Sequence, residues 1–229
     1  MERILRAGAG WAEGIADALR GANRPIPLDE RLLSRDIDGQ IIRRRYERAT
    51  FPPARQAATL LVLYPDDDGR LVIPLTVRHA EMRAHAGEVS LPGGTVDAAD
   101  SGPEAAALRE AWEEIGLGPE LVRIVGALDD VWIPVSNYEL RPFVGTVASR
   151  PTLIPHDAEV AAIVELPLDA LFDDDVFGVE EFSARGLTVR AGAYRYGGVR
   201  IWGATALTLG MLAHVLEAAR FSDASEASS

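Results

Sequence analysis

The chain has 229 residues, which is enough to bury a full hydrophobic core in one domain with additions. Its 48% hydrophobic and 25% charged residues are the proportions of an ordinary soluble globular protein. A net charge of -12 disfavours a broad nucleic-acid or anionic-membrane surface, and the absence of cysteine excludes disulfides, thiolate zinc sites and cysteine nucleophiles. We therefore expect a cytoplasmic protein that has neither a nucleic-acid nor a membrane partner.

The first part of the chain is predicted to form an N-terminal helical extension, residues 1–52. Residues 1–20 mix apolar and charged side chains, so they lack the uninterrupted apolar stretch of a signal peptide or a membrane span. Their pattern is typical of an amphipathic helix that docks on the rest of the protein. Helical periodicity is interrupted between Gly21 and Pro27 and resumes over residues 29–49.

Two short apolar runs follow, over residues 56–64 and 70–77, and they predict a β-hairpin. The residues between them are Pro65-Asp66-Asp67-Asp68-Gly69, and Asp and Gly tolerate the backbone conformations of a tight turn. We interpret these aspartates as turn residues rather than as metal ligands. A short strand is predicted over residues 89–91, before a turn at Pro92-Gly93-Gly94.

The second half of the chain predicts further strands and a closing helix. The strand-like segments are residues 121–128, 139–147, 160–166, 187–194 and 199–202. The closing helix is expected over residues 204–220, and the polar residues 221–229 are expected to form a disordered tail. Because strands are mixed with few helices, the pattern favours an α+β sandwich over residues 53–220 rather than a doubly wound sheet.

A helix predicted from Pro103 to Ile115 separates apolar from acidic side chains. Ser101 and Glu104 have the spacing of a capping box before it, and Gly116 supplies its C-terminal stop. At 3.6 residues per turn, the apolar side chains fall on one stripe: Leu108, Ala111, Trp112 and Ile115.

Three glutamates, Glu110, Glu113 and Glu114, fall on the opposite face of this helix, since positions three and four apart are neighbours. Carboxylates at such a short spacing repel one another, and a hard divalent cation such as Mg²⁺ or Mn²⁺ would offset this repulsion. For a Glu-Glu pair alone, a merely solvated acidic face is the alternative interpretation.

The segment Arg109-Glu110-Ala111-Trp112-Glu113-Glu114-Ile115-Gly116-Leu117 resembles the second half of the Nudix box, G-x5-E-x7-R-E-U-x-E-E-x-G-U. The first half departs from the motif: Arg109 lies one residue farther from Gly94 than the motif prescribes, and Asp100 stands where its early Glu is expected. The resemblance implies a Nudix fold, an α/β/α sandwich with a mixed β-sheet between helices. It also implies that the three glutamates bind Mg²⁺ or Mn²⁺, with the Gly94 carbonyl as a further ligand.

A narrower resemblance covers the residues before the helix. Leu75-Thr76-Val77-Arg78 and the run from Met82 to Gly94 are similar to the pattern L-L-T-x-R-S-x3-R-x3-G-x3-F-P-G-G of the coenzyme A pyrophosphatase branch. Pro74, His79 and Leu91 replace the expected Leu, Ser and Phe. This resemblance implies hydrolysis of coenzyme A or its derivatives to 3′,5′-ADP and (acyl-)4′-phosphopantetheine.

The resemblance assigns roles to residues around the three glutamates. Arg109 would orient them, with a phosphate contact as the alternative, and Gly93 and Gly94 would let the backbone come close to metal or phosphate. Glu159, before a predicted strand, resembles a position that supplies an additional ligand or base, and an exposed strand-edge Glu is its alternative reading.

Three further residues are candidates for substrate binding. Arg78 and Arg83 would hold the extra 3′-phosphate, because a guanidinium fork suits phosphate oxygens, and surface salt bridges are the alternative. His85 would contact the nucleotide, or else form only a local hydrogen bond.

Two other functions remain open at this point. One is a Nudix pyrophosphatase for ADP-ribose or a dinucleotide, and the other is a non-catalytic nucleotide-sensing module on the same fold. In each case the partner is a small nucleotide diphosphate. The sequence leaves the oligomeric state open between a monomer and a homodimer.

Overall fold

The computed structural model describes residues 6–36, 38–42, 51–79, 88–184 and 187–226. Its main sheet has eight strands: β1 (Arg55–Pro65), β2 (Leu71–Arg78), β3 (Val89–Ser90), β4 (Gly93–Thr95), β5 (Arg123–Ala127), β6 (Val131–Ile133), β7 (Tyr138–Thr146) and β8 (Val160–Pro167). The order is β3-β2-β1-β7-β5, with β4 paired to β1, β6 to β7 and β8 to β2. β1 and β7 run parallel and the other pairs antiparallel, so the sheet is mixed.

A second, three-stranded sheet has the order β11-β10-β9: β9 (Phe177–Ala184), β10 (Leu187–Tyr196) and β11 (Val199–Ile201). The described helices are α2 (Trp11–Gly21), α3 (Pro103–Ile115) and α4 (Gly203–Glu226), with short 3-10 turns η1 (Glu30–Leu32), η4 (Pro119–Leu121) and η5 (Leu168–Phe172). None of the described helices is long and apolar enough to cross a membrane.

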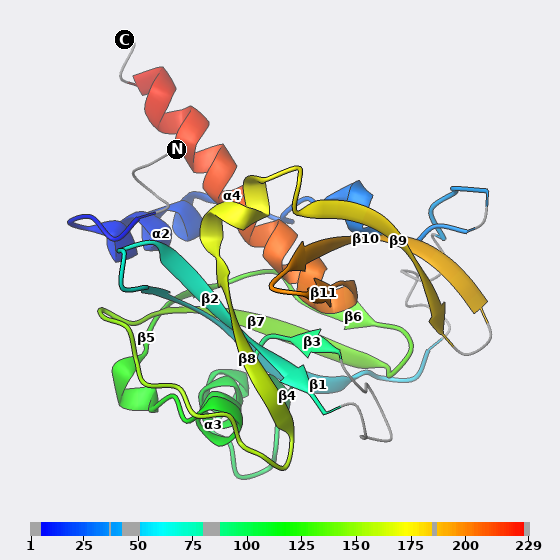
Figure 1. The fold of residues 1–229 in the computed structure, drawn as a ribbon, viewed down its shortest axis with the longest axis horizontal. Coiled ribbons are helices and arrows are strands. Elements are labelled where there is room, and N and C mark those ends of the chain that lie inside the picture. Colours follow the sequence, from blue (N-terminus) through cyan, green and yellow to red (C-terminus); the bar gives the residue numbers. More distant parts are fainter. Residues whose placement is uncertain (1–5, 37, 43–50, 80–87, 185–186, 227–229) are drawn as a thin grey trace.

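Strand β1 is buried on both faces and separates two layers of core. Alternate side chains of a strand point to opposite faces. Leu60 and Val62 therefore pack with Ala107 and Ala111 of α3, whereas Leu61 joins the cluster that contains the buried face of α4. The main sheet thus lies between α3 on one side and α2 and α4 on the other (Figure 1). This is the predicted α+β sandwich.

The predicted hairpin of β1 and β2 is confirmed, with Tyr64 opposite Val72. The Asp66 carboxylate accepts hydrogen bonds from the backbone N–H groups of Asp68 and Arg70, at 3.0 and 2.8 Å. This aspartate therefore shapes the turn, as the sequence indicated.

Helix α3 has the predicted bounds, and Gly116 ends it at a φ of 68°. Two details of the prediction were wrong. The N-cap residue is Gly102, and no side-chain capping bond forms, so Ser101 does not build a capping box. Trp112 is 56% exposed, because the buried arc of the helix runs through Ala111, Glu114 and Ile115 and leaves Trp112 outside it.

The N-terminal segment forms one helix rather than two within its described residues. Helix α2 contributes Ile15 and Leu19 to the core and packs against β5 and α4, which confirms the docked amphipathic helix. Beyond η1, residues 33–36 and 38–42 are not helical, because the Asp36 carboxylate accepts from the backbone N–H of Gln40 and holds a turn. Residues 43–49 lie outside the described residues.

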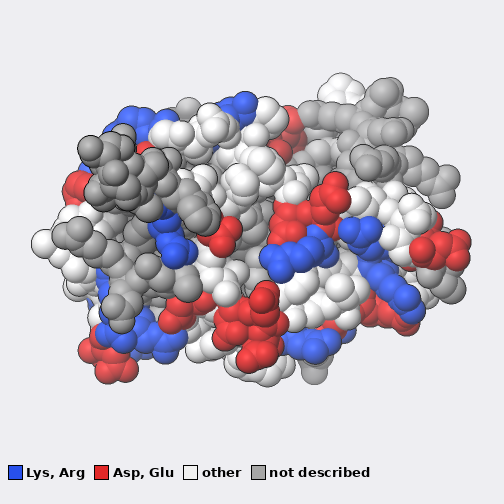
Figure 2. All heavy atoms as spheres, turned by 90° about the horizontal axis from the view of Figure 1, so that it is seen from above, with Lys and Arg blue, Asp and Glu red and all other residues white. Residues whose placement is uncertain are grey.

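Three strands were not predicted: β4, β6 and β9. Helix α4 continues to Glu226, so residues 221–226 are not the disordered tail that we expected. On the face of the molecule seen in Figure 2, acidic and basic side chains of the described residues are interspersed rather than gathered by sign.

Candidate functional site

The glutamate face of α3 lies against the short strand β4. Gly93 and Gly94 pair with Thr59 and Ala58 of β1, which holds the β4 backbone beside the helix. A Cβ on Gly94 would lie 2.3 Å from an oxygen of Glu110, and a Cβ on Gly93 would lie 2.4 Å from the Ala58 carbonyl oxygen. Gly93 therefore requires glycine, because a Cβ there would clash with the β1 backbone, whereas a side chain at Gly94 would displace the Glu110 carboxylate.

Glu114 is the buried member of the three glutamates, with 5% of its surface exposed. It accepts a hydrogen bond from the Gly93 N–H at 3.2 Å. Burial raises the pKa of Glu114 to about 7, and the nearby charges of Glu110 and Glu159 act in the same direction. The hydrogen bond from Gly93 and the charge of Arg78 oppose this rise only in part. Glu114 thus sits where negative charge is poorly compensated.

Arg109 connects the helix to the loop before it. Its Nη1 donates to Glu110 and to Glu113, both at 2.9 Å. Its Nε and Nη2 form a fork on Asp100, at 3.0 and 3.1 Å, and Nη2 also donates to the Thr95 carbonyl at 3.1 Å. Arg109 therefore orients two of the three glutamates, which supports the role expected for it.

Glu110 and Glu113 differ in exposure. The Glu110 side chain is 18% exposed and the Glu113 side chain 54%. Burial raises the pKa of Glu110, although the Arg109 guanidinium lowers it in part. Of this pair, Glu110 is thus the more buried side chain, as Glu114 also is, and Glu113 faces the solvent.

Glu159 reaches the same region from a different part of the chain. The backbone N–H groups of Ile154 and His156 donate to the backbone carbonyls of Ile115 and Glu114, both at 2.9 Å, so the segment before β8 runs along the end of α3. The charge of Glu159 contributes to the raised pKa of Glu110 and Glu114. Glu159 is therefore a neighbour of the glutamate face.

Arg78, at the end of β2, also faces this group of carboxylates. Its Nη2 lies 4.0 Å from a Glu159 oxygen, and its charge lowers the pKa of Glu114. Its Nε is buried and has no hydrogen-bond partner within the described part of the chain. Arg83 and His85 lie outside the described residues.

Sequence reasoning did not assign Asp100 a role. The signal was present, since Asp100 occupies the motif position of an early Glu, but its fork with Arg109 depends on how the loop folds back. The charge of Arg109 holds the pKa of Asp100 below its usual value through these hydrogen bonds. Asp100 therefore positions Arg109.

Among the described residues, no three Asp, Glu or His side chains lie close enough together to bind one metal ion. The reason is local, because Arg109 holds Glu110 and Glu113, whereas Gly93 holds Glu114. Divalent cation binding would therefore require the carboxylates to turn toward a common point.

Comparison with known proteins places this site in a family context. A family model described as NUDIX domain matches residues 54–185. A relative from Citrobacter koseri, named Uncharacterized Nudix hydrolase NudL, is 32% identical over 189 residues, which cover 80% of this chain and 92% of the relative. Nudix hydrolase 15, mitochondrial, of Arabidopsis thaliana is 38% identical over 164 residues, covering 68% of this chain and 56% of that protein. The crystal structure of RenU, a Nudix hydrolase from M. smegmatis, is 21% identical with a TM-score of 0.46, covering 76% of this chain and 89% of that one.

Proposed function

This chain belongs to the Nudix hydrolase family, enzymes that cleave phosphoric anhydride bonds, and from that premise we propose that it hydrolyses coenzyme A or a derivative to 3′,5′-ADP and (acyl-)4′-phosphopantetheine. The observation that supports the hydrolysis is the group formed by Glu110, Glu113 and Glu114 with Arg109, held against the β4 backbone.

The glutamate group fits a divalent cation, which Nudix hydrolases generally need. All its side-chain donors are carboxylate oxygens, the type that Mg²⁺ and Mn²⁺ prefer. The pKa of Glu114 and of Glu110 is raised chiefly by burial, and the charges of Arg109 and Arg78 offset this rise only in part, so a bound cation would stabilise the ionised carboxylates. The space that a Cβ on Gly94 would fill is taken by the Glu110 carboxylate, which brings that carboxylate within reach of the β4 backbone. We therefore propose Glu110, Glu113, Glu114 and the Gly94 carbonyl as ligands.

When bound, the cation supplies a Lewis acid for the diphosphate and lowers the pKa of a water that attacks phosphorus. The chain's own residues orient this reaction. Arg109 and Asp100 fix the direction of Glu110 and Glu113, and Gly93 fixes Glu114. Glu159, more than half exposed, is proposed as an additional ligand or as the base that takes a proton from the water.

Substrate recognition is proposed for the residues before β4. Among the described residues, the Arg78 Nε has no hydrogen-bond partner and its Nη2 lies 4.0 Å from Glu159, so the guanidinium is proposed to donate to a phosphate. Arg83 and His85 remain candidates from the sequence. The coenzyme A substrate rests on the resemblance of this segment and on the charge of Arg78.

A substrate panel tests this proposal directly. The purified chain is incubated with Mg²⁺ or Mn²⁺ and with coenzyme A, an acyl-coenzyme A, ADP-ribose, NADH and a diadenosine polyphosphate, and products are separated by ion-exchange chromatography. We expect release of 3′,5′-ADP from coenzyme A in clear preference to AMP from the others. Rapid turnover of ADP-ribose alone would replace coenzyme A with another diphosphate substrate, and no turnover on any substrate would favour a nucleotide-sensing module.

Replacing Gly94 with Ala is expected to lower turnover by about 100-fold, because the added Cβ would displace the Glu110 carboxylate that lies 2.3 Å from it. Steady-state kinetics measure the loss, and thermal denaturation checks that the fold persists. Gly14→Ala is the matched control, since nothing lies within 4 Å of its added Cβ. Equal turnover in the two variants would contradict the placement of Glu110 at the reaction centre.

A further inference from the structure

Strand β4 contributes two backbone groups that hold the glutamate face of α3. The Gly93 N–H donates to the Glu114 carboxylate at 3.2 Å. The Thr95 carbonyl accepts a hydrogen bond from the Arg109 Nη2 at 3.1 Å, and Arg109 in turn holds the other two glutamates. The direction of all three carboxylates therefore depends on where the β4 backbone lies.

Thr95 supplies the side chain by which this strand can be fixed. β4 has three residues, and the other two are Gly93 and Gly94, which have no side chain to pack. Glycine within a strand weakens it, because it adds conformational freedom to the chain and contributes no side-chain contact. The position of β4 is therefore sensitive to the contacts of the Thr95 hydroxyl.

The Thr95 hydroxyl forms a hydrogen bond with the hydroxyl of Tyr138, the first residue of β7, at 3.1 Å. Thr95 lies opposite Ala57 of β1, whereas Tyr138 lies opposite Arg55, two residues earlier on that strand. Side chains two residues apart share one face of a sheet, and the small side chain of Ala57 leaves room between them. The hydrogen bond thus joins β4 to β7 across β1.

The rest of Tyr138 is held by contacts that do not involve its hydroxyl. Its ring packs against the core cluster on the α4 side of the sheet, and the Arg55 guanidinium lies 4.6 Å from the ring centre. β7 pairs with β1 without interruption from Arg55 to Leu63. Removing the hydroxyl therefore leaves β7 in place, and its effect falls on β4.

We propose that Tyr138 is a positioning residue for divalent cation binding, and that it acts through Thr95. The Tyr138 hydroxyl fixes Thr95, and the Thr95 carbonyl fixes Arg109. This inference rests on the proposed cation site of the three glutamates. Tyr138 itself contacts neither the cation nor the substrate, so its loss weakens cation binding although every proposed ligand is still present.

Mn²⁺ binding to the full chain without substrate tests this proposal, with electron paramagnetic resonance spectroscopy measuring the unbound ion. We expect the dissociation constant to rise by about 3- to 10-fold in Tyr138→Phe and in Thr95→Val, since each variant removes one partner of the hydrogen bond. Thr95→Ser keeps the hydroxyl and should bind Mn²⁺ like the unaltered chain. The double variant should bind no more weakly than either single variant, because both break the same bond.

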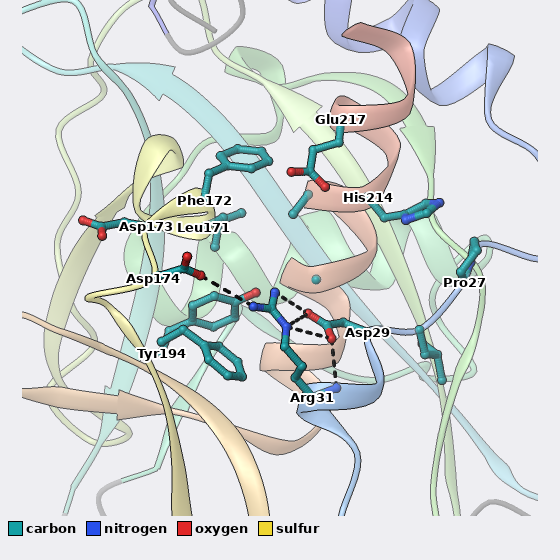
Figure 3. A pocket seen from close by; sticks show the side chains of 14 residues that line it. Pro27, Asp29, Arg31, Leu171, Phe172, Asp173, Asp174, Tyr194, His214 and Glu217 are labelled. Atoms are coloured by element: carbon teal, nitrogen blue, oxygen red, sulfur yellow. Dashed lines mark hydrogen bonds and ion pairs between the residues drawn. The ribbon is translucent and has the colours of Figure 1, made fainter. Parts of the chain in front are cut away.

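Tyr194→Phe is the matched control, because it removes a tyrosine hydroxyl far from β4. Tyr194 lines a cavity of about 490 Å³ beside η5 and α4, and none of the residues that line this cavity belongs to α3 or β4 (Figure 3). Its Mn²⁺ affinity should equal that of the unaltered chain. Thermal unfolding in EDTA should give similar transition temperatures for Tyr138→Phe and the unaltered chain, which separates a positioning role from a loss of fold.

Unchanged Mn²⁺ affinity in both Tyr138→Phe and Thr95→Val would overturn the proposal, and so would losses that add up in the double variant. Thr95→Val breaks the bond from the other side, so the test stands even where one variant fails to fold. Because no substrate is present, the result does not depend on coenzyme A. A lack of Mn²⁺ binding by the unaltered chain would overturn the cation site itself and this proposal with it.

Discussion

Glu114→Gln is expected to reduce turnover by several orders of magnitude and, at the same time, to make the fold more stable at pH 8 in EDTA. The stability effect follows from the pKa of Glu114, which is raised from 4.5 to about 7 in the folded chain. A carboxyl whose pKa is higher in the folded than in the unfolded state destabilises the fold as pH rises through that interval. The penalty is complete above pH 7 and corresponds to about 3 kcal/mol. Gln is neutral at every pH and still offers an oxygen to the Gly93 N–H.

Chemical denaturation of both proteins between pH 4.5 and pH 8 measures this effect. The stability difference should nearly vanish near pH 4.5 and grow as the pH rises. Glu104→Gln is the matched control, since Glu104 is exposed in the first turn of the same helix, and it should keep turnover and show no comparable pH dependence. A Glu114→Gln variant that is active, or less stable than the unaltered chain at pH 8, would contradict the account of this residue.

Arg109→Ala is expected to lower turnover by ~10–100-fold and to weaken the apparent Mn²⁺ affinity, as loss of a group that orients metal ligands does. The variant frees Glu110 and Glu113 from their common donor and leaves Asp100 without its fork. Arg109→Lys keeps the charge but loses the fork, so a defect in both variants would assign the effect to geometry.

Arg190→Ala is the control for Arg109, because Arg190 also forms a two-point contact with a carboxylate, that of Glu181, at 2.9 and 2.7 Å, and lies in the three-stranded sheet. Its turnover and Mn²⁺ dependence should equal those of the unaltered chain. Activity titrations over a range of Mn²⁺ concentrations measure both quantities. An Arg109→Lys variant with full activity would show that charge alone is sufficient.

The elements that could be predicted are those whose signals are local. Helix α3 has a proline at its start, a periodic apolar face and a glycine that ends it at positive φ, and its bounds were predicted to the residue. Strand β9 was missed because its segment contains two glutamates, Glu180 and Glu181. It pairs with β10 along its whole length. Its formation depends on that partner more than on its own pattern.

At the candidate site, too, the sequence predicted the features that depend on local spacing and not those that depend on packing. The three glutamates lie on one helix, so their spacing was visible in the sequence. The burial of Glu114 and the fork between Asp100 and Arg109 depend on how β4 and the loop pack on the helix, and they could not be predicted from spacing. The exposure of Trp112 was missed for a related reason, since the buried arc includes a glutamate instead of the tryptophan.

Crystals grown or soaked with Mn²⁺ test most directly the claim that the glutamate face of α3 binds divalent cations. Anomalous scattering locates the manganese without assumptions about the ligands. We expect at least one ion within about 2.2 Å of carboxylate oxygens of Glu110, Glu113 or Glu114, with Glu113 turned away from Arg109. Manganese that binds only elsewhere, with these carboxylates still on Arg109 and Gly93, would contradict the central claim.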